Sequence, residues 1–139
     1  MLEPHRERGD ASEKKVRVLL VEDDPTNRFV TVAKLTKRGY NVAVAENGQV
    51  ACEKLYREIF DVVLMDVSMP IMDGFEATTK IRSSSEPFST VPIIGLTAHG
   101  HDEVRQRCFK TGMDDFLCKP VQGDVICAAI DRVLGARKS

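Results

Sequence analysis

Three acidic side chains lie at the ends of two apolar runs of the sequence. Glu22 and Asp23 follow the run 16–21, and Asp66 ends the run 61–66. Carboxylates about 4 Å apart repel by about 4 kcal/mol at an effective dielectric constant near 20, so such a group needs a proton or a cation. A ligand set made only of oxygen favours Mg²⁺ over Zn²⁺. If the fold brings the two runs together, the sequence predicts a magnesium site.

A hydroxyl and an ammonium group end two later apolar runs. Thr97 follows the run 91–96, and Lys119 follows the run 115–118. Lys119 would supply one positive charge to the carboxylates, and a divalent cation would balance the rest.

Simpler explanations cover some of the polar residues near these runs. A lone strand-end acid such as Glu22 is often a helix cap, and Asp24 before Pro25 is better explained as one. His99 and His101 could form a small metal site, but they lack the third protein ligand that zinc requires. Capping does not explain acids, a hydroxyl and an ammonium group at four strand ends together.

These residues act jointly only if the fold gathers the ends of the apolar runs. The runs resemble strands covered on both faces, and they are 16–21, 41–45, 61–66, 91–96 and 115–118. Apolar periodicity predicts helices between and after them, at 25–38, around 52–59, and at 73–81, 101–112 and 121–134. Asp73 is predicted to cap the third of these helices, and Gly112 to end the fourth. The segment 83–90 is predicted to be a polar loop.

Strict alternation of five strands and five helices predicts an α/β fold with a doubly wound parallel sheet. We expect right-handed crossovers and the flavodoxin-like strand order 2-1-3-4-5. In such sheets ligands bind beyond the carboxyl ends of the strands, near the point where the winding reverses. The carboxylates, the hydroxyl and the ammonium group should therefore meet at one edge of the sheet.

Length and charge limit the functions that are open to the chain. It has 139 residues and a formal net charge of −1, which indicates one domain and gives no field that would attract nucleic acid or a membrane surface. No apolar run reaches the roughly 18 residues that a membrane span needs. We expect a flexible tail or linker at 1–15, the folded domain at 16–135 and a C-terminal tail at 136–139.

The four cysteines form no CxxC pair and fit neither a zinc site nor a disulfide framework. We expect four reduced, mostly buried thiols in a cytoplasmic protein.

At the strand ends the sequence resembles the receiver domains of two-component signalling, over about residues 15–134. Four motifs carry the resemblance: VLLVEDD at 18–24, LMDVSMPIMDG at 64–74, IGLTA at 94–98 and GMDDFLCKP at 112–120. Their order and spacing together are highly specific. Asn27-Arg28 after the acidic pair is most similar to receivers attached to hybrid sensor histidine kinases.

The resemblance implies a role for each site residue. Asp66 would be the phosphoacceptor, and Thr97 and Lys119 would contact the phosphoryl oxygens. Mg²⁺, for which Mn²⁺ can substitute, would be held by Asp66 and three further groups: Glu22, Asp23 and the backbone carbonyl of Ser68. Thr97 and Phe116 would be the switch residues. Pro70 and Gly74 would shape the loop after the acceptor, and the Lys119–Pro120 peptide would be cis.

The resemblance also implies a function and partners. The domain would take a phosphoryl group from a phosphohistidine on a histidine kinase or a phosphotransfer domain, and would lose it by its own hydrolysis. It would turn over no external substrate, although the parent of an excised hybrid fragment would be a histidine kinase. A downstream protein would bind the face formed by the helix 101–112, the strand 115–118 and the last helix. We expect a monomer.

Two other functions compete with this one. The first is a receiver-like module that binds partners without phosphorylation, but such modules usually lack the acceptor, the acidic pair or the lysine. The second is a phosphatase with an aspartyl-phosphate intermediate, which would need a second aspartate where Ser68 stands. No glycine-rich phosphate loop follows the first strand, which argues against a dinucleotide or flavin site.

Overall fold

The computed structural model describes residues 15–67, 73–98 and 101–138. Its five strands form one parallel sheet in the order β2-β1-β3-β4-β5, which confirms the predicted topology. The strands are β1 (Arg17–Val21), β2 (Asn41–Ala45), β3 (Val62–Asp66), β4 (Ile93–Thr97) and β5 (Asp115–Cys118).

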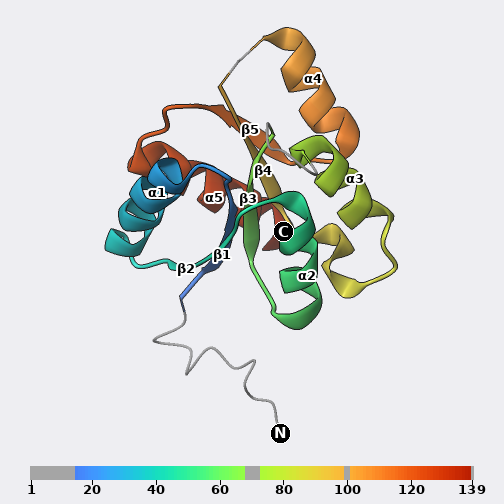
Figure 1. Ribbon diagram of the computed structural model, residues 1–139, viewed down its shortest axis with the longest axis horizontal. Coiled ribbons are helices and arrows are strands. Elements are labelled where there is room, and N and C mark those ends of the chain that lie inside the picture. The colour runs from blue at the N-terminus through green and yellow to red at the C-terminus, as the bar shows by residue number, and fades with distance from the viewer. Residues whose placement is uncertain (1–14, 68–72, 99–100, 139) are drawn as a thin grey trace, which may run out of the picture.

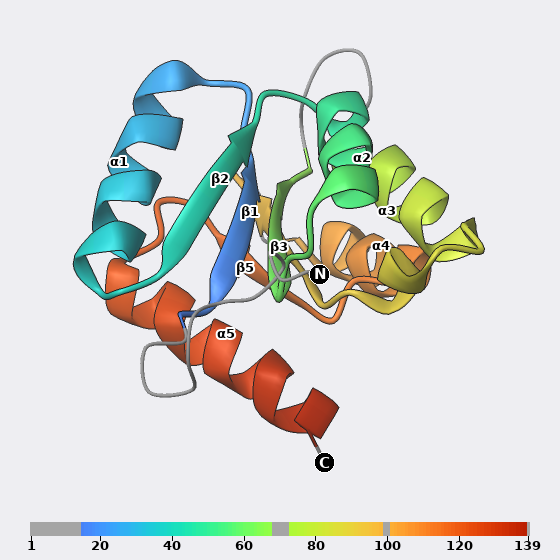
Figure 2. The same cartoon turned by 90° about the horizontal axis from the view of Figure 1, so that it is seen from below.

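Helices cover both faces of the sheet. They are α1 (Pro25–Lys37), α2 (Gly48–Arg57), α3 (Gly74–Ser83), α4 (Asp102–Thr111) and α5 (Gly123–Lys138), with a short 3₁₀ helix, η2 (Pro87–Thr90), before β4. Helices α1 and α5 lie on one face of the sheet, and α2, α3 and α4 lie on the other (Figures 1 and 2). The molecule therefore has three layers, with the sheet in the middle.

The alternation of side chains along the central strands divides the core in two. Leu19 and Val63 pack in the cluster that includes α2, α3 and α4 residues. Leu20 and Leu64 pack in the other cluster, with residues of α1 and α5. All four side chains are fully buried. A strand covered on both faces is apolar along its whole length, which is why these runs are nearly continuous in the sequence.

Helix ends follow the predicted capping residues. Asp24 accepts a hydrogen bond from the backbone N–H of Asn27 at 2.7 Å, and Asp73 accepts one from Glu76 at 2.8 Å. Gly112 ends α4 with φ of 110°, a left-handed conformation that glycine adopts without strain. These caps place the starts of α1 and α3 next to the ends of β1 and β3.

Two segments differ from the sequence prediction. The last helix begins at Gly123 rather than at about residue 121, and it continues to Lys138. Most of the segment 136–139, which we expected to be a tail, is thus helical, because alanine, arginine and lysine follow Gly135 and all favour helix. The predicted loop 83–90 contains the 3₁₀ helix η2, which begins at a proline in the first helical position.

The cysteines are all free thiols, but only two of them are buried. Cys52 and Cys108 lie in the core, whereas Cys127 is half-buried and Cys118 is exposed at the end of β5. The expectation that most are buried was therefore wrong for Cys118, because β5 is an edge strand. Within the described ranges, the structure contains no helix of the length and apolar character that a membrane span requires.

A buried hydroxyl in α3 gives a stability prediction. Thr78 is fully buried, and its Oγ1 has no hydrogen-bond partner among the residues that the structure describes. We expect Thr78→Val to raise the free energy of unfolding by about 1 kcal/mol, because it removes an unsatisfied polar group and keeps the branched shape. Urea denaturation measures this change. The same substitution at the exposed neighbour Thr79 is the control, and a loss of stability at position 78 would contradict the prediction.

Candidate functional site

Three carboxylates meet at the carboxyl ends of β1 and β3. The two strands are neighbours, and Val21 stands opposite Met65, so Glu22 follows one strand beside Asp66 on the other. One oxygen from each of Glu22, Asp23 and Asp66 lies within 4.8 Å of the others. Glu22 and Asp66 are only 2% and 3% exposed, whereas Asp23 is accessible to solvent. The cluster predicted from the sequence is therefore present in the fold.

Lys119 contacts two of the three carboxylates of this cluster. It follows β5, and its backbone N–H donates to the carbonyl of Thr97 at 2.7 Å. Its Nζ lies 3.0 Å from Glu22 Oε1 and 3.1 Å from Asp66 Oδ2. One ammonium group thus serves two buried carboxylates, and the cluster with Asp23 keeps two negative charges in excess.

Burial and neighbouring charges shift the pKa values of both Glu22 and Lys119. Burial raises the pKa of Glu22, and the negative charge of Asp66 adds to this, while the hydrogen bond from Lys119 partly offsets it. Burial alone would lower the pKa of Lys119, but its contacts with Glu22 and Asp66 together raise it. Lys119 is therefore a permanent cation at neutral pH.

The donor set suits a hard divalent cation. All three candidate ligands offer carboxylate oxygens, and the excess negative charge is the kind that Mg²⁺ neutralises. Neither histidine nor cysteine belongs to this group, so its chemistry is not that of a zinc site. Ser68, whose carbonyl was the fourth expected ligand, lies outside the described residues, as do Pro70 and His99.

Thr97 ends β4 beside the acceptor strand. Leu96 stands opposite Asp66 in the register, and Thr97 is the next residue, 2% exposed. It also stands opposite Cys118, the residue before Lys119. The strands therefore bring the hydroxyl-bearing residue to the same edge as the carboxylates and the lysine.

Phe116 belongs to β5, and its ring packs against α4. Its half-buried ring meets Phe109 edge-on, with ring centroids 6.2 Å apart, and the guanidinium carbon of Arg105 lies 5.9 Å from its centroid. The ring is thus on the same face of the sheet as α4. The Lys119–Pro120 peptide that follows β5 is cis, as the resemblance implied.

Sequence reasoning missed a basic residue next to the acidic pair. Arg28 donates from its Nη1 to the carbonyl of Glu22 at 2.9 Å and, at 3.4 Å, to that of Asp23. Side chains of a helix lean towards its N-terminus, so an arginine in the second turn of α1 could have been expected to return to the strand end. In the sequence, Arg28 is notable only as part of the Asn27-Arg28 motif.

Gly74 allows α3 to approach the acceptor closely. Its N–H donates to the carbonyl of Val67 at 3.2 Å, and a Cβ at this position would overlap the backbone carbonyl of Asp66. In contrast, a Cβ on Gly135 in α5 would meet no heavy atom within 4 Å. Close packing therefore requires glycine at position 74, whereas position 135 has room for a side chain.

Because of this contrast, replacing glycine by alanine should change the free energy of unfolding in opposite directions at the two positions. We expect Gly74→Ala to lower the free energy of unfolding by about 2 kcal/mol, because backbone atoms must shift to admit the methyl group. Gly135→Ala should raise it by about 0.5–1 kcal/mol through helix propensity. Urea denaturation of both variants checks the pair, and a Gly74→Ala protein as stable as the wild type would contradict it.

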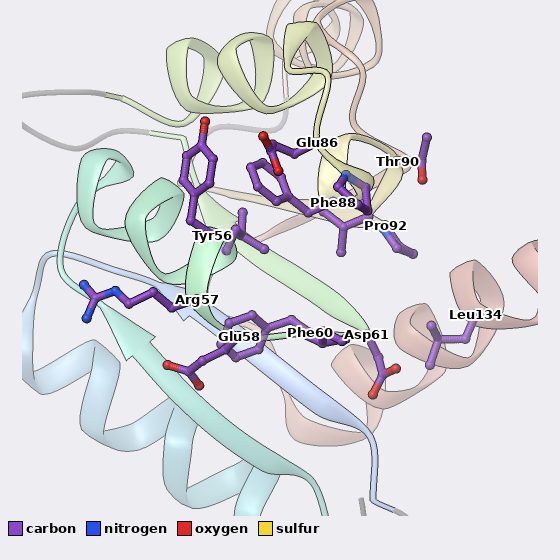
Figure 3. Close-up of a pocket in the computed structure, with 14 residues that line it drawn as sticks. Tyr56, Arg57, Glu58, Phe60, Asp61, Glu86, Phe88, Thr90, Pro92 and Leu134 are labelled. Atoms are coloured by element: carbon purple, nitrogen blue, oxygen red, sulfur yellow. The ribbon is translucent and has the colours of Figure 1, made fainter. Parts of the chain in front are cut away.

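A separate cavity opens at the other end of the sheet. It has a volume of about 650 Å³ and is lined by the end of α2, the segment before β3, η2 and Leu134 of α5. Tyr56 and Phe88 meet edge-on there, with centroids 5.0 Å apart (Figure 3). None of the described residues predicted for the acidic site lines this cavity, which lies where β3 and β4 begin.

The chain matches known proteins over most of its length. The model of the response regulator receiver domain family matches residues 18–131. Sensor histidine kinase RcsC of Escherichia coli K12 is 38% identical over 123 residues, 88% of this chain and 13% of that protein. Sensor protein GacS of Pseudomonas syringae is 40% identical over 112 residues, 79% of this chain and 12% of that protein. The chain thus spans a small part of these relatives.

Solved structures have the same fold. The receiver domain of sensor histidine kinase PA1611 from Pseudomonas aeruginosa PAO1, which has a magnesium ion coordinated in its active-site cleft, is 37% identical with a TM-score of 0.80. The similarity covers 87% of this chain and 98% of that one. Chemotaxis protein CheY4 of Vibrio cholerae is 32% identical with a TM-score of 0.80, over 86% and 98% of the two chains.

Proposed function

The chain belongs to the response regulator receiver domain family, and from this premise we propose that Asp66 accepts a phosphoryl group from a phosphohistidine donor. The observation that carries the proposal is the buried Asp66 carboxylate, 3.1 Å from Lys119 and grouped with the carboxylates of Glu22 and Asp23. Such a site concentrates opposite charges around one nucleophile, and phosphoryl transfer depends on positioning and charge neutralisation of this kind.

In the proposed reaction, an oxygen of Asp66 attacks the phosphorus atom of the donor. An O–P bond forms as the P–N bond to the donor imidazole breaks; the electron pair stays on the imidazole, which takes a proton from solvent. Lys119, already beside Asp66, would pair with one phosphoryl oxygen and Thr97 would donate to another. Mg²⁺ at Glu22, Asp23, Asp66 and the Ser68 carbonyl would neutralise the transferring oxygens, a role that Mn²⁺ can also fill.

We propose that the phosphoryl group changes the face of the molecule next to β5. The aspartyl phosphate would draw the Thr97 hydroxyl towards it, and Phe116, now half-buried against Phe109, would move inward. The surface made by α4, β5 and α5 would then bind a downstream protein. Water would later cleave the acyl phosphate, so the domain resets itself and turns over no external substrate.

We also propose a cellular setting for the domain. Similarity to hybrid kinases suggests a donor that is a histidine kinase or a histidine phosphotransfer domain, in the cytoplasm, and a monomeric receiver at residues 16–135. Residues 1–15 would then be a tail or linker. The output would be a protein contact rather than nucleic-acid or membrane binding, in keeping with the net charge of −1.

Phosphotransfer from a labelled donor tests the proposal. A histidine phosphotransfer domain that carries a radiolabelled phosphoryl group is mixed with the chain and Mg²⁺, and the label on each protein is followed by gel electrophoresis. We expect the label to move to the wild type and to the Asp131→Asn control, which changes an exposed acid of α5, but not to Asp66→Asn. Label that never leaves any of several such donors would favour a module that binds partners without phosphorylation.

A further inference from the structure

We propose that Arg28 is a positioning residue for the acidic pair. Its guanidinium group holds the peptide carbonyls of Glu22 and Asp23, and so fixes the direction from which their carboxylates face a cation. The inference rests on the proposed function in one respect, because it requires Mg²⁺ to bind at the carboxylate cluster.

Arg28 links the first part of α1 to the connection between β1 and α1. The backbone N–H of Arg28 donates to the carbonyl of Asp24 at 2.9 Å, which begins the helix. From the same residue, Nη1 reaches back to the carbonyl of Glu22 at 2.9 Å and that of Asp23 at 3.4 Å. Three consecutive carbonyls of the connection are therefore held by one half-buried residue of α1.

The N–H and both carboxylate oxygens of Glu22 also form hydrogen bonds, so the contact of its carbonyl with Arg28 means that all of its polar groups are held. Its N–H donates to Ala45 at 3.0 Å, Oε1 accepts from Lys119 at 3.0 Å, and Oε2 accepts from the N–H of Asp24 at 3.2 Å. Asp23, in contrast, has a solvent-accessible carboxylate. The peptide after Asp23 helps to fix the backbone from which that carboxylate projects, and this is the peptide whose carbonyl Arg28 reaches.

A positioning role of Arg28 and a purely electrostatic role predict opposite effects of its removal on Mg²⁺ binding. A positive charge near a cation site repels the cation, so if Arg28 acted only through its charge, its removal would tighten Mg²⁺ binding. If Arg28 orders the ligands, its removal weakens binding, because the loop must then be ordered by the ion. Groups that orient metal ligands contribute about 10-fold to 100-fold in affinity. Arg28 acts on the backbone rather than on the carboxylates, so we expect the lower end of that range.

Titration with Mg²⁺ alone measures this effect without phosphorylation. Amide chemical shifts of isotope-labelled protein give Kd for the wild type, Arg28→Gln, Arg28→Lys and Lys37→Gln. Lys37→Gln removes the same charge from the exposed far end of α1. We expect Kd about 10-fold higher for Arg28→Gln and a smaller increase for Arg28→Lys, which keeps the charge and part of the reach. Lys37→Gln should stay within about twofold of the wild type.

The outcomes separate this inference from the proposed function. Arg28→Gln binding Mg²⁺ as tightly as the wild type, or more tightly, would overturn the positioning role. Wild-type protein without saturable shifts would instead remove the metal site on which the proposed function depends. Urea unfolding in chelator checks that each variant is folded. If Arg28→Gln is unfolded, Arg28→Lys decides, and a Kd equal to or below that of the wild type overturns the inference.

Discussion

Asp66→Asn protein is expected to take up no phosphoryl group from any donor, while it remains folded. An amide oxygen is a much weaker nucleophile than a carboxylate, and no other carboxylate in the cluster is placed like Asp66, at the end of the central strand β3. Each carboxylate oxygen of Glu22 accepts a hydrogen bond, Oε1 from Lys119 and Oε2 from the N–H of Asp24. The loss should therefore be complete, whereas a merely auxiliary acid would leave a measurable rate.

The same substitution should change stability in a direction that depends on the metal. In chelator the cluster carries two negative charges in excess, so removing one should raise the free energy of unfolding by about 1 kcal/mol. Added Mg²⁺ should stabilise the wild type through binding to the folded state and should stabilise Asp66→Asn much less. Asp131→Asn, at an exposed position of α5, is the control. Phosphoryl uptake by Asp66→Asn would contradict the assignment of the acceptor.

Lys119→Met should slow phosphorylation by about 100-fold, a loss typical of removing one preorganised group that stabilises a developing charge. Methionine keeps the apolar stem of the side chain but not the ammonium group that lies 3.1 Å from Asp66. Because one cation is removed from the site, Mg²⁺ should bind more tightly to this variant. The combination of tighter metal binding and slower chemistry separates a role of Lys119 at the phosphoryl group from a role in holding the metal.

The rate with a small-molecule donor and the Mg²⁺ Kd are measured on the same protein. Lys80→Met, at an exposed position of α3, is the control for loss of a lysine. In chelator, Lys119→Met should unfold more easily, by about 3 kcal/mol, because Glu22 and Asp66 lose their common partner. A wild-type rate of phosphorylation in Lys119→Met would refute the catalytic role.

Much of this site could be predicted because it follows from strand ends. The strand order sets which strand ends are neighbours, and the alternation of apolar runs and helices predicted a doubly wound sheet, for which the observed order is a common solution. Glu22, Asp66, Thr97 and Lys119 then meet through backbone geometry alone. The caps at Asp24 and Asp73 are equally local, which is why they too were predicted correctly.

Features that depend on side-chain reach or close approach could not be predicted in this way. That Lys119 contacts Glu22 as well as Asp66 depends on the length of both side chains. The closeness of Gly74 to Asp66 depends on how α3 docks against β3.

Intact mass shows whether Asp66 takes one phosphoryl group in a Mg²⁺-dependent reaction. The protein is incubated with acetyl phosphate or phosphoramidate, either with Mg²⁺ or with a chelator, beside Asp66→Asn. We expect a gain of one phosphoryl group by the wild type with Mg²⁺, and none in chelator or in the variant. No gain by folded wild-type protein with either donor and Mg²⁺, or an equal gain by Asp66→Asn, would contradict it.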